Sequence, residues 1–89
     1  MSVPRHFSDT RTEEGRVRIL AVSGRVLLDA EGPGWQHRSA HPSLEDATLE
    51  LALLPRVGAD LYAAALNDIE RQLRFTGPVT DDRSYPGAA

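Results

Sequence analysis

The chain has 89 residues, 40% of them hydrophobic and 26% charged, with ten arginines, no lysine and a formal net charge of −3. It contains no cysteine, which excludes disulfides, thiolate metal sites and cysteine nucleophiles. This composition is typical of one small globular domain, and the acidic balance argues against a nucleic-acid binder, which usually carries a basic footprint.

The two ends of the chain are polar and interrupted by proline or glycine. Residues 1–14 contain no apolar run, which argues against a secretory signal, and no stretch approaches the length of a membrane span. We therefore expect flexible tails over residues 1–14 and 78–89 around a single α+β domain spanning residues 15–77. A cytoplasmic location is the default expectation.

Residues 16–31 predict an antiparallel β-hairpin with Ser23 and Gly24 as its two-residue turn. In this register one face is apolar and pairs Ala21 with Val26, Ile19 with Leu28, and Val17 with Ala30. The other face pairs Leu20 with Leu27, Arg18 with Asp29, and Arg16 with Glu31. A slip of one residue would destroy both patterns, so the register is strongly specified.

After the hairpin, Gly32, Pro33 and Gly34 predict a turn, followed by an extended piece from Trp35 to about Ser39. Trp35 is the only tryptophan of the chain. We expect it to cover an edge of the core, and an exposed tryptophan that binds a partner is the alternative.

The segment from residue 44 to 54 fits two structures. Leucines at 49, 51 and 53 alternate with more polar positions, which favours a half-buried strand over residues 47–54 that ends at Pro55. A capping-box pattern that begins at Ser43 favours a helix instead, with an apolar stripe formed by Leu44, Ala47, Leu51 and Leu54. We predict the strand and retain the helix as the alternative.

Residues 59–75 predict a helix, with Asp60 near its positive end and Gly77 and Pro78 after its last turn. Its apolar stripe is formed by Tyr62, Leu66, Ile69 and Leu73, widened by Leu61 and Ala65. The predicted fold class is therefore α+β. A small antiparallel sheet, made of the hairpin and one or two further strands, packs against this one C-terminal helix.

His37 and His41, flanked by Trp35, Glu45 and Asp46, form the only clustering of side chains suited to a metal or to general-base catalysis. Pro42 and the preceding glycines favour a loop or strand here, and we interpret the two histidines as solvated. Ser39 between them lacks the sequence context of an activated serine. We predict no catalytic residue, no metal and no cofactor.

One helix can cover only one face of the sheet, so the hairpin's other face exposes Leu20, Val22 and Leu27, with Arg25 beside them. We expect these four residues to form an interface, unless the tails or the segment around residue 44 fold over them. Two of the hairpin's arginines are neutralised by Asp29 and Glu31, so neither nucleic acid nor a membrane is the expected partner.

The predicted function is that of a non-enzymatic protein–protein interaction module. It would be a small regulator or inhibitor, such as one encoded by a phage or mobile element, that forms a homodimer or docks on a larger protein. The alternative is a small dimeric α+β enzyme or ligand-binding protein with a pocket near Trp35, His37, His41 and Tyr62.

Overall fold

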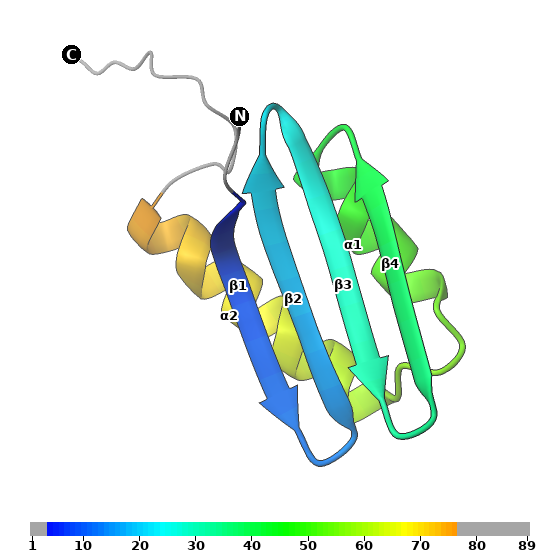
Figure 1. Cartoon of the computed structure of the whole chain (residues 1–89). Coiled ribbons are helices and arrows are strands. Elements are labelled where there is room, and N and C mark those ends of the chain that lie inside the picture. The colour runs from blue at the N-terminus through cyan, green and yellow to red at the C-terminus, as the bar shows by residue number, and fades with distance from the viewer. Residues whose placement is uncertain (1–3, 77–89) are drawn as a thin grey trace, which may run out of the picture.

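A computed structural model describes residues 4–76 and shows a four-stranded antiparallel sheet followed by two helices (Figure 1). The elements are β1 (Arg5–Thr12), β2 (Gly15–Val22), β3 (Arg25–Gly32), β4 (Trp35–His41), α1 (Leu44–Leu53) and α2 (Ala59–Thr76). The strands neighbour one another in chain order, and both helices lie against the same face of the sheet, α2 over β1 and β2 and α1 over β3 and β4. The α+β fold class is confirmed.

The hairpin of β2 and β3 has the predicted register at every pair. Ile19 lies opposite Leu28 on the helix-covered face, and Arg18 lies opposite Asp29 on the other face. Ser23 and Gly24 have φ angles of 46° and 76°, so both turn residues are left-handed, as a type I′ hairpin turn requires.

Strand β1 corrects the prediction of a flexible tail over residues 1–14. Arg5–Thr12 pair with β2, with an irregularity between His6 and Ser8. The fully buried residues of this strand are polar, since Ser8 and Thr10 are only 4% and 9% exposed, while Phe7 at the irregularity is half-buried against the core. Because these small polar residues replace the apolar ones of an ordinary core strand, the sequence shows no hydrophobic alternation there. The predicted tail over residues 78–89 lies outside the described residues.

Helix α1 corrects the predicted strand over residues 47–54. Ser43 caps the helix, since its Oγ accepts a hydrogen bond from the backbone N–H of Asp46 at 3.2 Å. Leu51 is 1% exposed, whereas Leu49 and Leu53 are 63% and 76% exposed. The three leucines thus do not share a face, and the apolar stripe of the helical alternative is the one that packs on the sheet.

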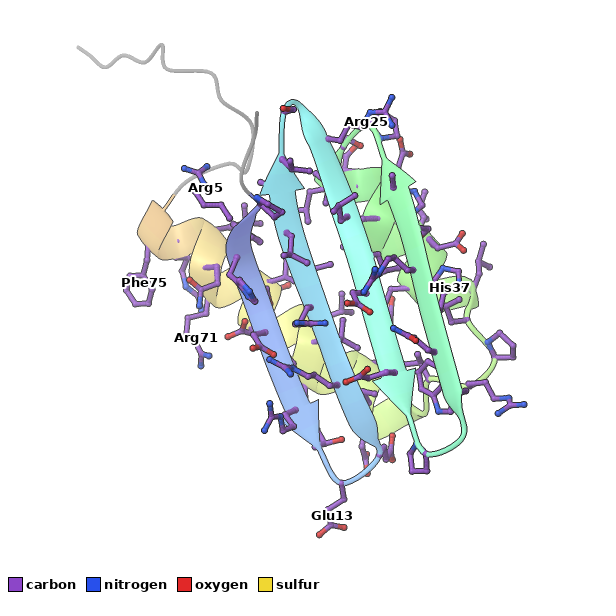
Figure 2. The ribbon with its side chains drawn as sticks, viewed as in Figure 1. Arg5, Glu13, Arg25, His37, Arg71 and Phe75 are labelled. Atoms are coloured by element: carbon purple, nitrogen blue, oxygen red, sulfur yellow. The ribbon has the colours of Figure 1, made fainter. Side chains whose placement is uncertain are left out.

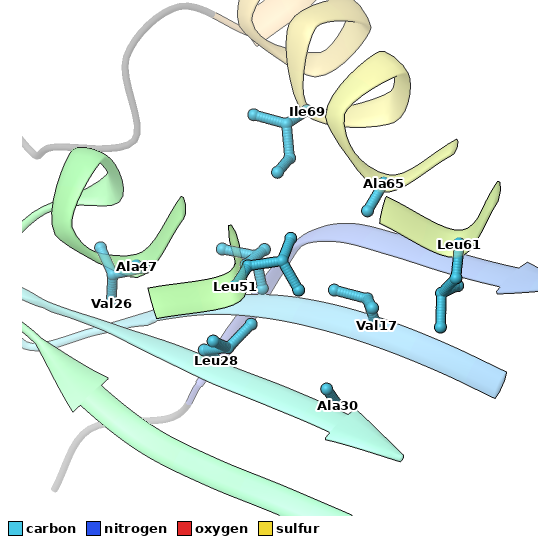
Figure 3. Packing of buried hydrophobic residues seen from close by; sticks show 10 residues of the cluster. Val17, Val26, Leu28, Ala30, Ala47, Leu51, Leu61, Ala65 and Ile69 are labelled. Carbon is cyan, nitrogen blue, oxygen red and sulfur yellow. The ribbon is translucent and has the colours of Figure 1, made fainter. Parts of the chain in front are cut away.

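The core lies between the sheet and the two helices (Figure 3). Helix α2 has the predicted extent to within one residue, and its N-terminus is capped from a distance, because Glu14 Oε1 accepts a hydrogen bond from the N–H of Leu61 at 3.2 Å. The buried hydrophobic residues are Val17, Ile19, Val26, Leu28, Ala30, Ala47, Leu51, Leu61, Ala65 and Ile69. On α2 the most buried line therefore runs through Leu61 and Ala65, while Tyr62 and Leu66 are half-buried beside it.

Candidate functional site

The sheet face opposite the helices is covered by no helix of the described chain (Figures 1 and 2). We call it the open face. Because side chains alternate across a strand and paired residues share a face, its members follow from the register. They are His6, Asp9, Arg11, Arg16, Arg18, Leu20, Val22, Arg25, Leu27, Asp29, Glu31, Gln36, Arg38 and Ala40.

An apolar row crosses the open face near one end of the sheet. It consists of His6, Leu20, Leu27 and Ala40, each paired with the next across neighbouring strands. The structure places the predicted interface residues Leu20, Val22 and Leu27 on this face, and all three are half-buried. The segment around residue 44 lies on the opposite side of the sheet as α1, so it does not cover them.

A charged row lies beside the apolar row, and its charge alternates in sign from strand to strand. It consists of Asp9, Arg18, Asp29 and Arg38, one residue from each strand. Sequence reasoning placed Arg18 opposite Asp29 but did not extend the row, because residues 5–12 were not expected to form a strand and the pairing of Arg38 was not predicted.

Asp29 is the buried centre of the charged row, at 5% exposure. Its Oδ2 accepts hydrogen bonds from Arg18 Nη2 at 2.5 Å and from Arg38 Nη2 at 3.3 Å. Its Oδ1 is buried with no hydrogen-bond partner within the described chain. An unsatisfied buried acceptor costs about 1–3 kcal/mol.

Asp9, at the outer end of the row, is held by Arg16. Arg16 donates from Nε to Asp9 Oδ1 at 2.9 Å and from Nη2 to Oδ2 at 2.7 Å. These hydrogen bonds hold the pKa of Asp9 below its ordinary value. Asp9 therefore stays ionised at neutral pH, and its side chain remains 38% exposed to a partner.

A shallow pocket of about 240 Å³ opens between the two rows, near the middle of the open face. Its walls are Pro4, Arg18, Leu20, Leu27, Asp29 and Arg38. Aliphatic side chains, two guanidinium groups and a carboxylate thus meet at one place. This combination suits the polar and apolar side chains of a protein surface.

Charge is divided between the two sides of the domain. The open face carries five arginines and three acids, whereas residues 44–76, which form the helical layer, carry three arginines and six acids. The sequence contrast between the two halves of the chain therefore becomes a contrast between two faces. Arg25, the fourth predicted interface residue, is exposed at one end of the open face.

His37 and His41 lie on the other side of β4, facing the helices. The two rings share Ser39: its Oγ lies 3.1 Å from His37 Nε2 and 2.7 Å from His41 Nε2. Glu50 of α1 approaches the same His37 nitrogen, with Oε2 at 3.2 Å. Residues two apart share a face in a strand, so β4 brings the histidines together without a helix, and they are half-buried rather than solvated.

This histidine group lacks the geometry of a catalytic relay. A relay needs the acid on one ring nitrogen and the serine on the other, whereas Glu50 and Ser39 both approach Nε2 of His37. Within residues 4–76 no group of three histidine, cysteine or acidic side chains is placed to hold a metal ion. The group therefore links β4 to α1.

Trp35 stands at the start of β4 and packs against the edge of the core, as expected. Its indole lies over Gly32, where a Cβ would collide with Nε1. Tyr62 of α2 is also half-buried against the core. The structure thus gives the two aromatic residues of the alternative pocket packing roles.

Along the described part of the chain, neither helix combines the length and the hydropathy that a membrane span requires. Comparison of the chain with protein-family models, with curated proteins and with solved structures found no match.

Proposed function

We propose that this protein is a non-enzymatic protein–protein interaction module that binds its partner through the open face. The observation that supports the proposal is the uncovered face of a four-stranded sheet, on which the half-buried Leu20 and Leu27 lie beside the charged row. A small domain commonly completes its burial in a complex.

The surroundings of Asp29 support a protein as the partner. Leu20 and Leu27 provide aliphatic surface on the two central strands of the face, and arginines surround them. Arginine beside apolar surface is typical of interface centres, because the guanidinium packs flat and donates up to five hydrogen bonds. A small regulator or inhibitor with this surface would act by covering part of the surface of another protein.

Two matched double variants test the proposal. Leu20→Arg with Leu27→Arg adds two charges to the open face, and Leu49→Arg with Leu53→Arg adds the same two charges to the exposed side of α1. We expect light scattering and affinity capture from the host to show that the first pair abolishes assembly and the second preserves it. Circular dichroism must show that both variants remain folded.

The proposal fails if assembly is equally strong with and without the substitutions at Leu20 and Leu27. It also fails if the unmodified protein neither self-associates nor retains any partner. A partner that the α1 variant loses instead would move the binding surface to the helical layer.

A further inference from the structure

We infer that the open face binds the open face of a second copy of this chain. The two copies are related by a twofold axis that runs parallel to the strands, between the two open faces and above the boundary of β2 and β3. The inference rests on the proposed function of the open face and names its partner. The order of charges across the sheet supports this partner.

Such an axis reverses the strand order, so β1 faces the partner's β4 and β2 faces the partner's β3. The charged row of one copy then lies opposite the charged row of the other copy, in reversed strand order. Asp9 faces the partner's Arg38, and Arg18 faces the partner's Asp29. Each contact occurs twice by symmetry. All four charges of the row therefore meet the opposite sign.

The rows on either side of the charged row fit the same operation. Arg16 faces the partner's Glu31, because these residues are paired neighbours in one row of the sheet. In the apolar row, Leu20 faces the partner's Leu27. The two arginines without an acid opposite them also avoid each other, since Arg11 faces the partner's Gln36 and Arg25 faces the partner's Val22.

The arrangement also brings a further donor to the pocket of the open face. Asp29 lines this pocket, and the partner's Arg18 lies over it. Arg18 uses Nη2 for its own chain's Asp29, and a guanidinium has further N–H groups to donate.

The order of charges favours this axis over a twofold axis perpendicular to the strands. An axis that runs across the strands, along the charged row, would place each residue of the row opposite the same residue of the other copy. Arg18 would then face Arg18 and Asp29 would face Asp29, which is destabilising for charges directly opposite. Sheets packed with nearly aligned strands are, in addition, a common arrangement.

The size of the face indicates a weak dimer. Four strands at about 4.8 Å spacing and seven residues at about 3.4 Å rise give roughly 450 Å² for each copy, or about 900 Å² in total. This lies below the usual size of stable interfaces and within the range of transient ones. We therefore expect association in the micromolar range or weaker, with the helices on the two outer sides of the dimer.

Asp9 and Arg38 provide the test, because they lie on the two edge strands of one copy. Three strand spacings separate them by about 14 Å, beyond the screening length of about 8 Å in physiological salt. They face each other only between copies. The variants are Asp9→Arg, Arg38→Glu and the two together, examined by sedimentation equilibrium from about 10 μM to about 1 mM.

We expect the unmodified chain to dimerise and each single substitution to raise the dissociation constant by about tenfold or more, because two like-charged contacts replace two attractive ones. The double variant restores dimerisation, since the exchanged charges at positions 9 and 38 again meet the opposite sign on the other copy. An equimolar mixture of the two single variants restores it too, which keeps the test decisive if the double variant folds poorly. Glu45→Arg and Arg56→Glu, exposed charges outside the open face, serve as controls.

A monomer throughout the concentration range overturns the inference, as does a dimer that neither single substitution weakens or that neither the double variant nor the mixture restores. These results are separable from failure of the proposed function. If the chain is monomeric but captures another protein in a manner that depends on Leu20 and Leu27, the proposed function stands and self-pairing does not.

Discussion

Replacing Asp68 with alanine removes the acceptor that joins the first strand to the last helix. Asp68 is 8% exposed, and its Oδ2 accepts a hydrogen bond from Ser8 Oγ at 2.5 Å, while Oδ1 accepts one from Arg71. Ser8 is itself 4% exposed, so the substitution leaves a buried hydroxyl without this partner.

The magnitude follows from these contacts. A hydrogen bond to a charged group contributes about 1.5–3 kcal/mol to stability, whereas the ion pair with Arg71, whose side chain is exposed, adds little. We expect Asp68→Ala to lower the free energy of unfolding by about 2–3 kcal/mol. For a domain of this size that corresponds to a fall in Tm of roughly 10–20 °C.

Urea and thermal unfolding, followed by far-ultraviolet circular dichroism, measure the loss. Glu70→Ala is the matched control, because Glu70 lies on the same helix and is exposed; its replacement should change the free energy of unfolding by less than about 0.5 kcal/mol. A double-mutant cycle with Ser8→Ala isolates the coupling between the two side chains. If Asp68→Ala is as stable as the control, the contact does not hold β1 to α2.

Three further outcomes follow from the same structure. Burial acts to raise the pKa of Asp68, but hydrogen bonds from Ser8 and its α2 neighbours outweigh it and hold that pKa below its ordinary 3.8. The unfolded chain therefore binds the proton more readily, so the wild type should lose more stability than Asp68→Ala as the pH falls from about 5 to about 2, and parallel curves in acid titrations of unfolding would contradict this. Gly15→Ala should destabilise by more than Gly24→Ala in urea titrations, because both glycines have positive φ but only at Gly15 does a Cβ meet a backbone carbonyl, that of Glu31. Ser43→Ala should cost about 0.5–2 kcal/mol of stability, measured in the same way, and no loss would mean that the cap of α1 is dispensable.

The hairpin and α2 were predictable because several local signals agree there. The Ser23–Gly24 turn and the cross-strand pairs specify the same register, and Asp60 and the stripe along α2 specify the same helix. Where the signals conflicted, tertiary packing decided. The alternating leucines of α1 resemble a strand, but the cap at Ser43 and the burial of Leu51 select a helix.

The first strand could not be predicted from hydrophobic pattern, because its two fully buried residues, Ser8 and Thr10, are hydroxylic. Ser8 satisfies its hydroxyl with Asp68, a residue 60 positions away in the sequence, and no local rule connects the two. Because β1 was not predicted, the charged row of the open face was not predicted either. The apolar part of that face was foreseen at Leu20 and Leu27, but the alternation of sign needs β1 and β4 to be in place.

The remote cap on α2 has a consequence for how the domain forms during synthesis. Glu14 emerges from the ribosome 47 residues before Leu61, and β1 can pair with β2 at once, but its inner surface waits for a helix that is made last. At about 5–20 residues per second, this interval lasts roughly 2–10 seconds. Until α2 is made, the inner surface of β1 and β2 lacks the helix that covers it, so completion of the domain is a late event that joins the end of the described chain to its beginning.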